Sequence, residues 1–403
     1  MLLDRSHFPI FKNVPELAYF DNAATTQIHQ FVLDAMLKYY TEYRASPGRG
    51  EYSLASRASA AVENACEQVA ALIGADSENI LFTRGATDAL NRVARWHSSV
   101  NTVIISEAEH NSNIVPWLAQ GRKKGEGLQV LPVDDTGLID VELASNIISR
   151  YPNSLISIAS VTNTTGELQP IHTIREIART YGCSLCIDAC QGIAHIDHNV
   201  KELDPDWLLF SGHKMYGPNG VGVLYSKHDL TAIKSLEFGG GAVRHTTFDT
   251  FDLPESMEKH SPGTPDTAGI IGIGVAAEII NYDSYSQIQL AESEVVSWLD
   301  QAGLFKLPDL FFISEHKLKG KERSILSFYP ARNHSSDIAT LMSESGVAIR
   351  TGRVCAHPMV DKHFGSNGIV RISVSPYNTQ EDCNKLVAEL SRTLNFLNKH
   401  ITQ

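Results

Sequence analysis

Apolar runs alternate with helical segments along the first half of the chain, and this alternation restricts the possible folds most strongly. Residues 27–44 and 56–73 predict helices. The apolar runs that predict strands are 80–83, 102–106, 128–133, 155–161, 184–188, 206–211 and 221–225. Because such alternation covers both faces of a sheet with helices, we expect an α/β fold with a mostly parallel, seven-stranded sheet sandwiched by helices.

Length and composition indicate more than one domain. The chain has 403 residues, of which 43% are hydrophobic. A chain of this length usually folds around more than one hydrophobic core. A polar loop follows residues 239–241, and a long helix over 266–282 is expected to lead into a smaller α+β domain. We expect an N-terminal segment over 1–25 that packs on the small domain, a large domain over 26–262, and the linking helix with the small domain over 263–403.

The charge and hydropathy patterns exclude two classes of protein. The net charge of −12 and the lack of clustered Lys and Arg argue against binding to nucleic acid. No apolar stretch approaches the ~20 residues that cross a bilayer, and the N-terminus lacks the apolar core of a signal peptide. The sequence therefore predicts a cytoplasmic protein that does not bind membranes.

Six cysteines in a chain of this kind predict reduced thiols and not a disulfide scaffold. Cys183 and Cys186 form a C-x-x-C pattern, which invites a redox or zinc interpretation. The pair lies on an apolar strand whose side chains alternate between faces, and no second pair is near. We therefore predict no metal site.

Two charged residues lie where apolar strands end. Asp188 ends the run 184–188, and Lys214 follows the run 206–211 before a Gly-Pro-Asn-Gly turn. Ligands of open α/β sheets bind beyond the carboxyl ends of the strands. A carboxylate for a pyridinium nitrogen and a lysine for an aldehyde are the two groups that pyridoxal phosphate chemistry requires. A surface lysine and an N-capping aspartate are the alternative, but the pair in this order favours the cofactor.

Further segments extend this pattern into a resemblance to a known family. The chain resembles fold-type I pyridoxal phosphate-dependent transferases of the class V aminotransferase family, and within it the cysteine desulfurases of the SUF and CSD type (group II). The matching segments run in family order, at 19–26, 82–88, 109–113, 162–166, 211–214, 263–265, 350–356 and 370–373. The resemblance implies that the large domain binds pyridoxal 5'-phosphate and that the protein is a homodimer.

The cofactor phosphate is expected at a helix N-terminus. Gly85, Ala86 and Thr87 lie between a predicted strand and a helix, and backbone amides there bind anions. The family usually has Thr at position 86, so one hydroxyl contact is missing in this chain. The resemblance implies that Ser211 and His213 complete the phosphate site.

The resemblance also implies contacts around the cofactor ring. His110 matches the histidine that stacks on the ring and moves protons, and Gln191 matches the residue that hydrogen-bonds the ring hydroxyl. Lys214 and Asp188 match the residues that bind the aldehyde and the ring nitrogen. Thr264 resembles the residue that reaches the phosphate of the neighbouring subunit. We expect Asn163, Arg350 and Arg371 to bind the substrate.

Asn163 and Arg371 match groups that hold a substrate carboxylate, a task that suits the forked guanidinium. We assign Arg350 to substrate binding as well. An arginine that closes a strand could equally form a structural ion pair, and the sequence does not separate the two roles.

Cys355 decides the reaction that we expect. In the family its counterpart attacks the substrate's sulfur, so that L-cysteine gives L-alanine and an enzyme persulfide for iron–sulfur cluster or other sulfur-dependent biosynthesis. Arg350 and Arg353 would raise the thiolate fraction if they point inward. Cys355 lies between Gly352 and Pro358, which predicts a mobile loop. The resemblance implies that this loop passes sulfur to an acceptor protein of the SUF-E or CSD-E type.

Three departures from the family pattern accompany these matches. Val354 stands where most such enzymes have His before the cysteine, although His357 lies nearby. Residues 46–50 replace Asn-Val-His-Arg-Gly, and Ser261 stands at a position that is usually acidic. The alternatives left open are a selenocysteine lyase that acts on L-selenocysteine, a C–S lyase, another class V enzyme that uses Lys214 without Cys355, and a non-catalytic scaffold.

Overall fold

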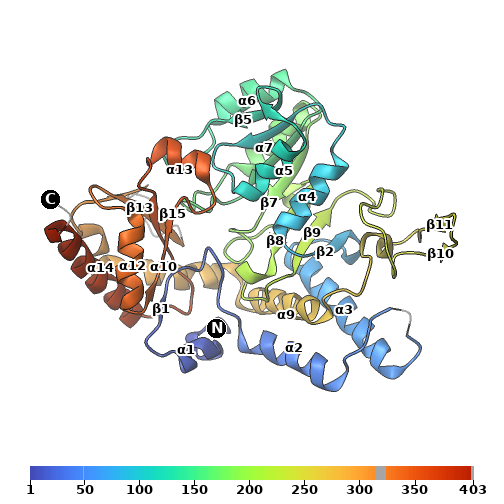
Figure 1. Cartoon of the computed structure of the whole chain (residues 1–403), viewed down its shortest axis with the longest axis horizontal. Coiled ribbons are helices and arrows are strands. Elements are labelled where there is room, and N and C mark those ends of the chain that lie inside the picture. The colour runs from blue at the N-terminus through green and yellow to red at the C-terminus, as the bar shows by residue number, and fades with distance from the viewer. Residues whose placement is uncertain (49, 314–323, 401–403) are drawn as a thin grey trace.

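A computed structural model describes residues 1–48, 50–313 and 324–400 (Figure 1). Arg49, in the departing segment 46–50, lies outside the described residues. Two sheets organise the chain: a large central sheet built from the first 226 residues, and a smaller sheet built from the C-terminal part. Figure 1 shows the small sheet with its helices at the left and the central sheet at the top and right.

The central sheet has eight strands in the order β2-β9-β8-β7-β6-β3-β5-β4. Only β9 runs antiparallel to its neighbours, so the expected mostly parallel sheet is confirmed. All seven predicted strands are present, and the eighth is the two-residue edge strand β4, which is too short to give an apolar run. The strands are β2 (Ile80–Thr83), β3 (Val103–Ser106), β4 (Lys123–Lys124), β5 (Gly127–Leu131), β6 (Leu155–Ala159), β7 (Ser184–Asp188), β8 (Trp207–Ser211) and β9 (Gly222–Ser226).

Helices cover both faces of this sheet and create a separate hydrophobic core on each. Leu185 and Ile187 of β7 belong to one core, with side chains of α3, α6, α7 and α9. Cys186 faces the other core, with side chains of α4 and α5, so Cys183 and Cys186 lie on opposite faces as the alternation predicted. The helices of this region are α2 (Gln30–Glu42), α3 (Ser53–Leu72), α4 (Ala86–Trp96), α5 (Val115–Ala119), α6 (Val141–Arg150), α7 (Ile171–Thr180), α8 (Val200–Leu203) and α9 (Thr267–Asp283).

The C-terminal part forms an α+β unit around a four-stranded antiparallel sheet, in the order β12-β13-β16-β15. Helices α10, α12 and α14 pack on it and share a third hydrophobic core. The elements are α10 (Tyr285–Gln301), β12 (Leu310–Phe312), β13 (Ile325–Pro330), α12 (Ser335–Glu344), β14 (Val347–Ala348), β15 (Arg350–Gly352), α13 (His357–His363), β16 (Ile369–Ser373) and α14 (Gln380–His400).

The N-terminal segment contacts both units. Its strand β1 (Ala18–Tyr19) pairs in parallel with β14, and Phe20 is buried in the small-domain core. Its helix α1 (Pro9–Asn13) instead contributes Phe11 to the core of the central sheet. Helix α9, which we predicted as a link to the small domain, also packs into that core, against α2 and α3. The boundaries at residues 25 and 262 stay predictions.

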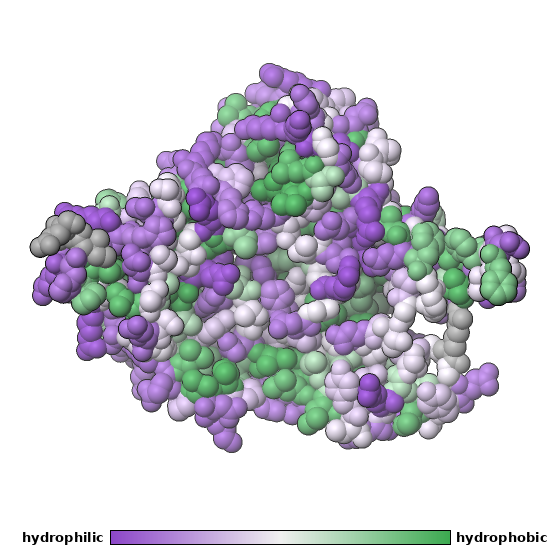
Figure 2. All heavy atoms as spheres, viewed as in Figure 1, coloured by the Kyte–Doolittle hydropathy of each residue, from purple (hydrophilic) through white to green (hydrophobic). Residues whose placement is uncertain are grey.

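A hairpin occupies the region where the sequence predicted a polar loop. Strands β10 (His245–Thr246) and β11 (Phe251–Asp252) pair antiparallel and project from the body of the molecule (Figure 1). The Phe248 side chain at the tip is fully exposed, and Phe251 is more than half exposed. Figure 2 shows hydrophobic surface on this projection at the right of the view. In the described part of the chain, no helix has the length and apolar character that crossing a membrane requires.

Candidate active site

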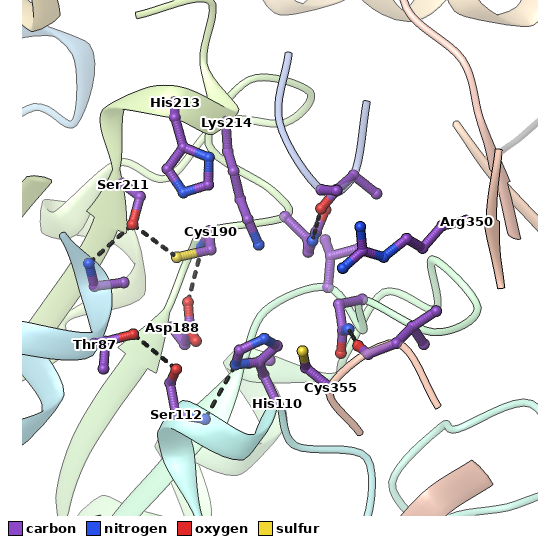
Figure 3. A pocket seen from close by; sticks show the side chains of 18 of the residues that line it. Thr87, His110, Ser112, Asp188, Cys190, Ser211, His213, Lys214, Arg350 and Cys355 are labelled. Atoms are coloured by element: carbon purple, nitrogen blue, oxygen red, sulfur yellow. Dashed lines mark hydrogen bonds between the residues drawn. The ribbon is translucent and has the colours of Figure 1, made fainter. Parts of the chain in front are cut away.

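A pocket opens at the carboxyl edge of the central sheet and is closed from the other side by the small domain. It contains about 840 Å³ of empty space, part of it open to solvent. It gathers twelve of the predicted site residues, from segments that lie far apart in the sequence (Figure 3). They are Ala86, Thr87, His110, Asn163, Asp188, Gln191, Ser211, His213, Lys214, Arg350, Cys355 and Arg371.

One end of the pocket is the open N-terminus of α4. Gly85 is the N-cap residue of this helix, with φ +138°, a conformation that favours glycine, and it has no side chain to cap the helix itself. The Ser211 Oγ accepts a hydrogen bond of 2.9 Å from the Ala86 amide, and the hydroxyls of Thr87 and Ser112 lie 2.8 Å apart. Amide and hydroxyl donors at a helix N-terminus suit a phosphate group.

Lys214 and Asp188 lie deeper in the pocket, where the parallel strands end. Asp188 is buried at the end of β7 and accepts a 3.0 Å hydrogen bond from the Cys190 amide. Lys214 ends a short 3₁₀ helix (Gly212–Lys214) directly after β8, and its amine points into the pocket (Figure 3). No carboxylate in the described part of the chain forms an ion pair with this amine. A buried carboxylate and an unpaired lysine fit the ring nitrogen and the aldehyde of pyridoxal phosphate.

His110 faces the pocket from the loop after β3. Its Nδ1 accepts a hydrogen bond of 3.1 Å from the Ser112 backbone amide, which can only donate. Burial and the positive charge of Lys214 lower the pKa of His110 to about 4. The ring is therefore neutral at physiological pH, with its proton on Nε2. This arrangement makes His110 a hydrogen-bond donor, and it could accept a proton only by giving up the bond to Ser112.

The histidine before the lysine shares this environment. Burial and the charge of Lys214 lower the pKa of His213 to about 4 as well.

Gln191 lines the pocket, and its Nε2 donates a 2.8 Å hydrogen bond to the Ala23 carbonyl. The predicted contact of Gln191 with a ring hydroxyl stays a prediction.

Two arginines from the small domain lie at the opposite end. Arg371 of β16 is buried, and its Nη1 and Nη2 donate to the Asn163 carbonyl (2.7 Å) and to Asp21 Oδ1 (3.2 Å). Its buried Nε has no hydrogen-bond partner within the described residues. Arg350 of β15 is half exposed, with Nη1 3.7 Å from Asp21 Oδ2. Arg371 thus has structural partners and an unused donor as well, so both interpretations of this arginine keep support.

Asn163 connects the arginine site to the loop that carries Cys355. Its Nδ2 donates a 2.6 Å hydrogen bond to the Val354 carbonyl, and its Oδ1 is buried without a partner within the described residues. We predicted that the Asn163 side chain binds the substrate carboxylate. In the structure, its amide nitrogen instead donates to the loop that carries Cys355. Its contact with substrate stays a prediction.

Cys355 lies in the four residues between β15 and α13, with its thiol exposed. Val354 and Cys355 both have left-handed backbone conformations, with φ +42° and +60°. Such conformations cost a non-glycine residue roughly 1–3 kcal/mol each. Hydrogen bonds from Asn163 Nδ2 to the Val354 carbonyl and from the Asn111 amide to the Cys355 carbonyl (2.7 Å) hold this turn. Any movement of the loop, which we predicted to be mobile, has to break these bonds.

Two residues that could have assisted Cys355 point elsewhere. Arg353 forms an ion pair of 2.7 Å with Asp361 on α13. The Nδ1 of His357 lies 2.7 Å from Asn111 Nδ2. Neither residue lines the pocket, so the expectation that Arg353 acts on the thiol is not supported. Of Arg350 and Arg353, Arg350 is the one that lines the site.

Thr264 lies apart from the pocket. It lines a separate surface hollow with Tyr39, Arg44 and Ser46. This position agrees with a role toward a neighbouring subunit, which stays a prediction.

Some residues of the site were missed in the sequence. Ser112 and Cys190 line the pocket, and Asp21 links the two arginines. Asp21 and Ser112 lie inside matching segments and Cys190 lies two residues after Asp188, but their places in the site depend on contacts with residues 87, 211, 350 and 371, which no local pattern shows. Cys190 is a second thiol in the pocket. Burial raises the pKa of this thiol far above its ordinary value, so it stays protonated and is a poor nucleophile.

The fold and the donor set of the pocket define a pyridoxal phosphate-dependent transferase of fold type I. The chain belongs to the aminotransferase class-V family, whose pattern it matches over residues 18–386. It is 36% identical to a probable cysteine desulfurase of Vibrio cholerae, over 98% of both chains.

Two solved structures extend this similarity. The crystal structure of the Escherichia coli cysteine desulfurase CsdA in its S-sulfonic acid form has a TM-score of 0.86 at 32% identity, covering 97% of this chain and 98% of that one. The apo cysteine desulfurase of Thermococcus onnurineus has a TM-score of 0.89 at 30% identity, covering 98% of each chain.

Proposed function

We propose that this protein is a cysteine desulfurase that converts L-cysteine into L-alanine and keeps the sulfur on Cys355 as a persulfide. The observation that carries the proposal is that the exposed Cys355 thiol lines the same pocket as Lys214 and Asp188 (Figure 3). The reaction balances without an oxidant or a reductant. Cysteine and the Cys355 thiol give alanine and the Cys355 persulfide.

The pocket residues fit pyridoxal phosphate at three places. The open N-terminus of α4 with Ser211 would hold the phosphate, Asp188 the ring nitrogen, and Lys214 the aldehyde carbon. When bound, this cofactor supplies an electron sink for the electron pair that remains when a proton leaves the substrate's Cα. A fixed carboxylate at the ring nitrogen strengthens that sink.

The chain's own groups orient the substrate and move its protons. Arg371 and Arg350 place positive charge at the small-domain end of the pocket, where Arg371 Nε is an unused donor for the substrate carboxylate. Lys214 Nζ, which lines the pocket and forms no direct ion pair among the described residues, is the group that takes the Cα proton. His110 donates from Nε2 and holds its position through Ser112.

Cys355 performs the step that distinguishes this reaction from other class V chemistry. Its thiolate attacks the substrate's sulfur, the new S–S bond forms, and the bond between that sulfur and Cβ breaks with its electrons moving to Cβ. A proton then completes the methyl group of alanine. Arg350 and Arg371 are the cations that line this end of the pocket together with Cys355.

The test is incubation of the cofactor-loaded protein with cysteine while alanine, free sulfide and protein persulfide are followed together. We expect one alanine for each sulfur, with the first sulfur on Cys355 by mass spectrometry. Free sulfide released at the rate of alanine formation, without any persulfide, would favour a C–S lyase. Turnover of selenocysteine with little turnover of cysteine would favour a selenocysteine lyase.

We also propose that the protein works as a homodimer. The projecting hairpin carries exposed Phe248 and Phe251, and exposed apolar side chains at Leu37 and Tyr40 lie on α2. Exposed apolar side chains on a projecting hairpin and on a helix are a feature that an interface between subunits would cover. Thr264 lines a hollow beside α2, which suits a contact across that interface. Sedimentation equilibrium tests the proposal, and a monomer at micromolar concentration would contradict it.

A sulfur-acceptor protein of the SUF-E or CSD-E type is the partner that we propose for the persulfide. The support is the exposure of Cys355 at the mouth of the pocket. A cytoplasmic location is the matching proposal, supported by six unpaired cysteines, since thiols stay reduced there.

A further inference from the structure

The side chain before the sulfur acceptor is buried although the acceptor itself is exposed. Val354 is 7% exposed and packs in a small hydrophobic cluster with Ile313, Val360 and Ile369. This cluster, which we call the loop socket, joins the cysteine loop to β16 and α13. It is separate from the main core of the small domain.

The backbone at Val354 is one that valine rarely adopts. Its φ is +42°, and the next residue, Cys355, has φ +60°. A left-handed conformation is a genuine outlier for a β-branched residue, whereas glycine adopts it freely. Such strain persists only when the surroundings determine the conformation. A side chain at position 354 therefore has to be supported by its packing in the loop socket.

Val354 is also tied to the substrate end of the pocket. Its carbonyl accepts the 2.6 Å hydrogen bond from Asn163 Nδ2, and the Asn163 carbonyl accepts the 2.7 Å bond from Arg371 Nη1. The loop socket and Asn163 thus hold Val354 from two sides, by its side chain and by its carbonyl. The Cys355 carbonyl is fixed separately by the Asn111 amide at 2.7 Å.

We propose that Val354 is a positioning residue, which anchors the strained turn in the loop socket and so holds the Cys355 sulfur at the substrate. The proposal rests on the proposed desulfurase function. Val354 itself lines the pocket, but valine has no group that donates or accepts a proton, and we assign its effect to the place of Cys355. An anchored thiol attacks without first ordering a loop, and misplacement of a reacting group by about 1 Å can cost up to about 10²-fold in rate.

The test compares Val354→Ala, Val354→Gly and Val354→Ile in the cofactor-loaded enzyme. We expect Val354→Ala to lower kcat about tenfold and Val354→Gly somewhat more, with the KM for cysteine changed less than about threefold. Val354→Ile, which keeps the anchor, should retain the wild-type rate within about threefold. Val354→Gly distinguishes anchoring by the side chain from strain in the backbone. It removes the anchor and relieves the strain together, so a lower rate indicates that anchoring dominates and a higher rate indicates that strain dominates.

A second readout does not depend on turnover. Alkylation of Cys355 by iodoacetamide in the absence of cysteine should become several-fold faster in Val354→Ala and Val354→Gly, because a released thiol samples more orientations. Val295→Ala is the matched control, since Val295 is equally buried in the small domain but belongs to its main core. It should change neither the alkylation rate nor kcat by more than about twofold.

Wild-type kcat and alkylation rate in Val354→Ala, or equal effects of Val295→Ala, would overturn the proposal. A faster reaction in Val354→Gly would show that strain and not anchoring matters. If Val354→Ala does not fold, Val360→Ala opens the loop socket from α13 and should change both readouts in the same direction. Absence of alanine and persulfide in the wild type would contradict the desulfurase function instead, while the alkylation comparison would still test the anchor.

Discussion

The two halves of the pocket are built in different ways. The cofactor half uses the ends of regular elements, with Asp188 on β7, Lys214 just after β8 and the amides of α4. The sulfur half uses a four-residue turn with two left-handed residues, held by Asn163 and Asn111. With the proposed roles, this difference would let one site hold a cofactor firmly and present a thiol both to a substrate and to the outside.

The largest expected effect lies in the cofactor half. Lys214→Ala should lower the rate of alanine formation on the order of 10⁴-fold or more, because both the aldehyde partner and the proton acceptor are removed. It should leave the alkylation rate of Cys355 within about twofold, since the sulfur half is held by other residues. Borohydride reduction of the wild type should label Lys214 in peptide maps, and a label on another lysine would contradict the assignment.

Asp188→Asn keeps the shape of the side chain but removes its charge. We expect a loss of about 10²-fold in kcat with cofactor still bound, because the ring nitrogen loses its anionic partner. Steady-state kinetics at saturating pyridoxal phosphate measures the effect. Near wild-type turnover of the fully loaded variant would show that this carboxylate does not act on the ring.

Asn163→Ala tests the connection between the halves. The variant leaves the Val354 carbonyl without its 2.6 Å partner, so Cys355 should be alkylated several-fold faster and kcat/KM for cysteine should fall about tenfold. Cofactor affinity, measured by fluorescence titration, should stay within about twofold. A large loss of cofactor affinity with unchanged alkylation would place Asn163 in the cofactor half instead.

The smallest expected effect concerns His110 and the way in which the free energy of unfolding depends on pH. Its folded-state pKa of about 4 lies below its ordinary value of 6.5. The unfolded chain therefore binds a proton here at a higher pH than the folded chain. This group lowers the free energy of unfolding as pH falls from about 6.5 to about 4, and contributes no such loss above that window. NMR titration of the His110 ring in the cofactor-free protein should show no transition near pH 6.5, and a transition there would contradict the neutral Nε2–H form.

The same contrast decides what the sequence could predict. The seven main strands are confirmed, and Asp188, Ser211 and Lys214 line the pocket as expected, because apolar runs end at Asp188 and Ser211, just before Lys214, and strand ends are local features. The resemblance added the roles of these residues. The missing edge strand β4 has two exposed lysines and leaves no apolar signal.

In the sulfur half, the sequence indicated which residues line the pocket but not the conformation of the turn or the directions of its side chains. The left-handed turn at Val354 and Cys355 depends on packing against the loop socket, whose members come from residues 313, 360 and 369. The outward direction of Arg353 depends on Asp361, and the place of Asp21 depends on Arg371. These are tertiary contacts, and tertiary contacts override local preference.

The central claim is that Cys355 accepts sulfur in a pocket whose cofactor half works independently of it. Cys355→Ser tests this claim most directly, in a single-turnover reaction with cysteine followed by alanine analysis and by mass spectrometry of the loop peptide. We expect wild-type cofactor binding and borohydride labelling at Lys214, with neither alanine nor persulfide formed. Alanine formation by Cys355→Ser at the wild-type rate would contradict it, and the enzyme would then be a lyase that needs no thiol at this position.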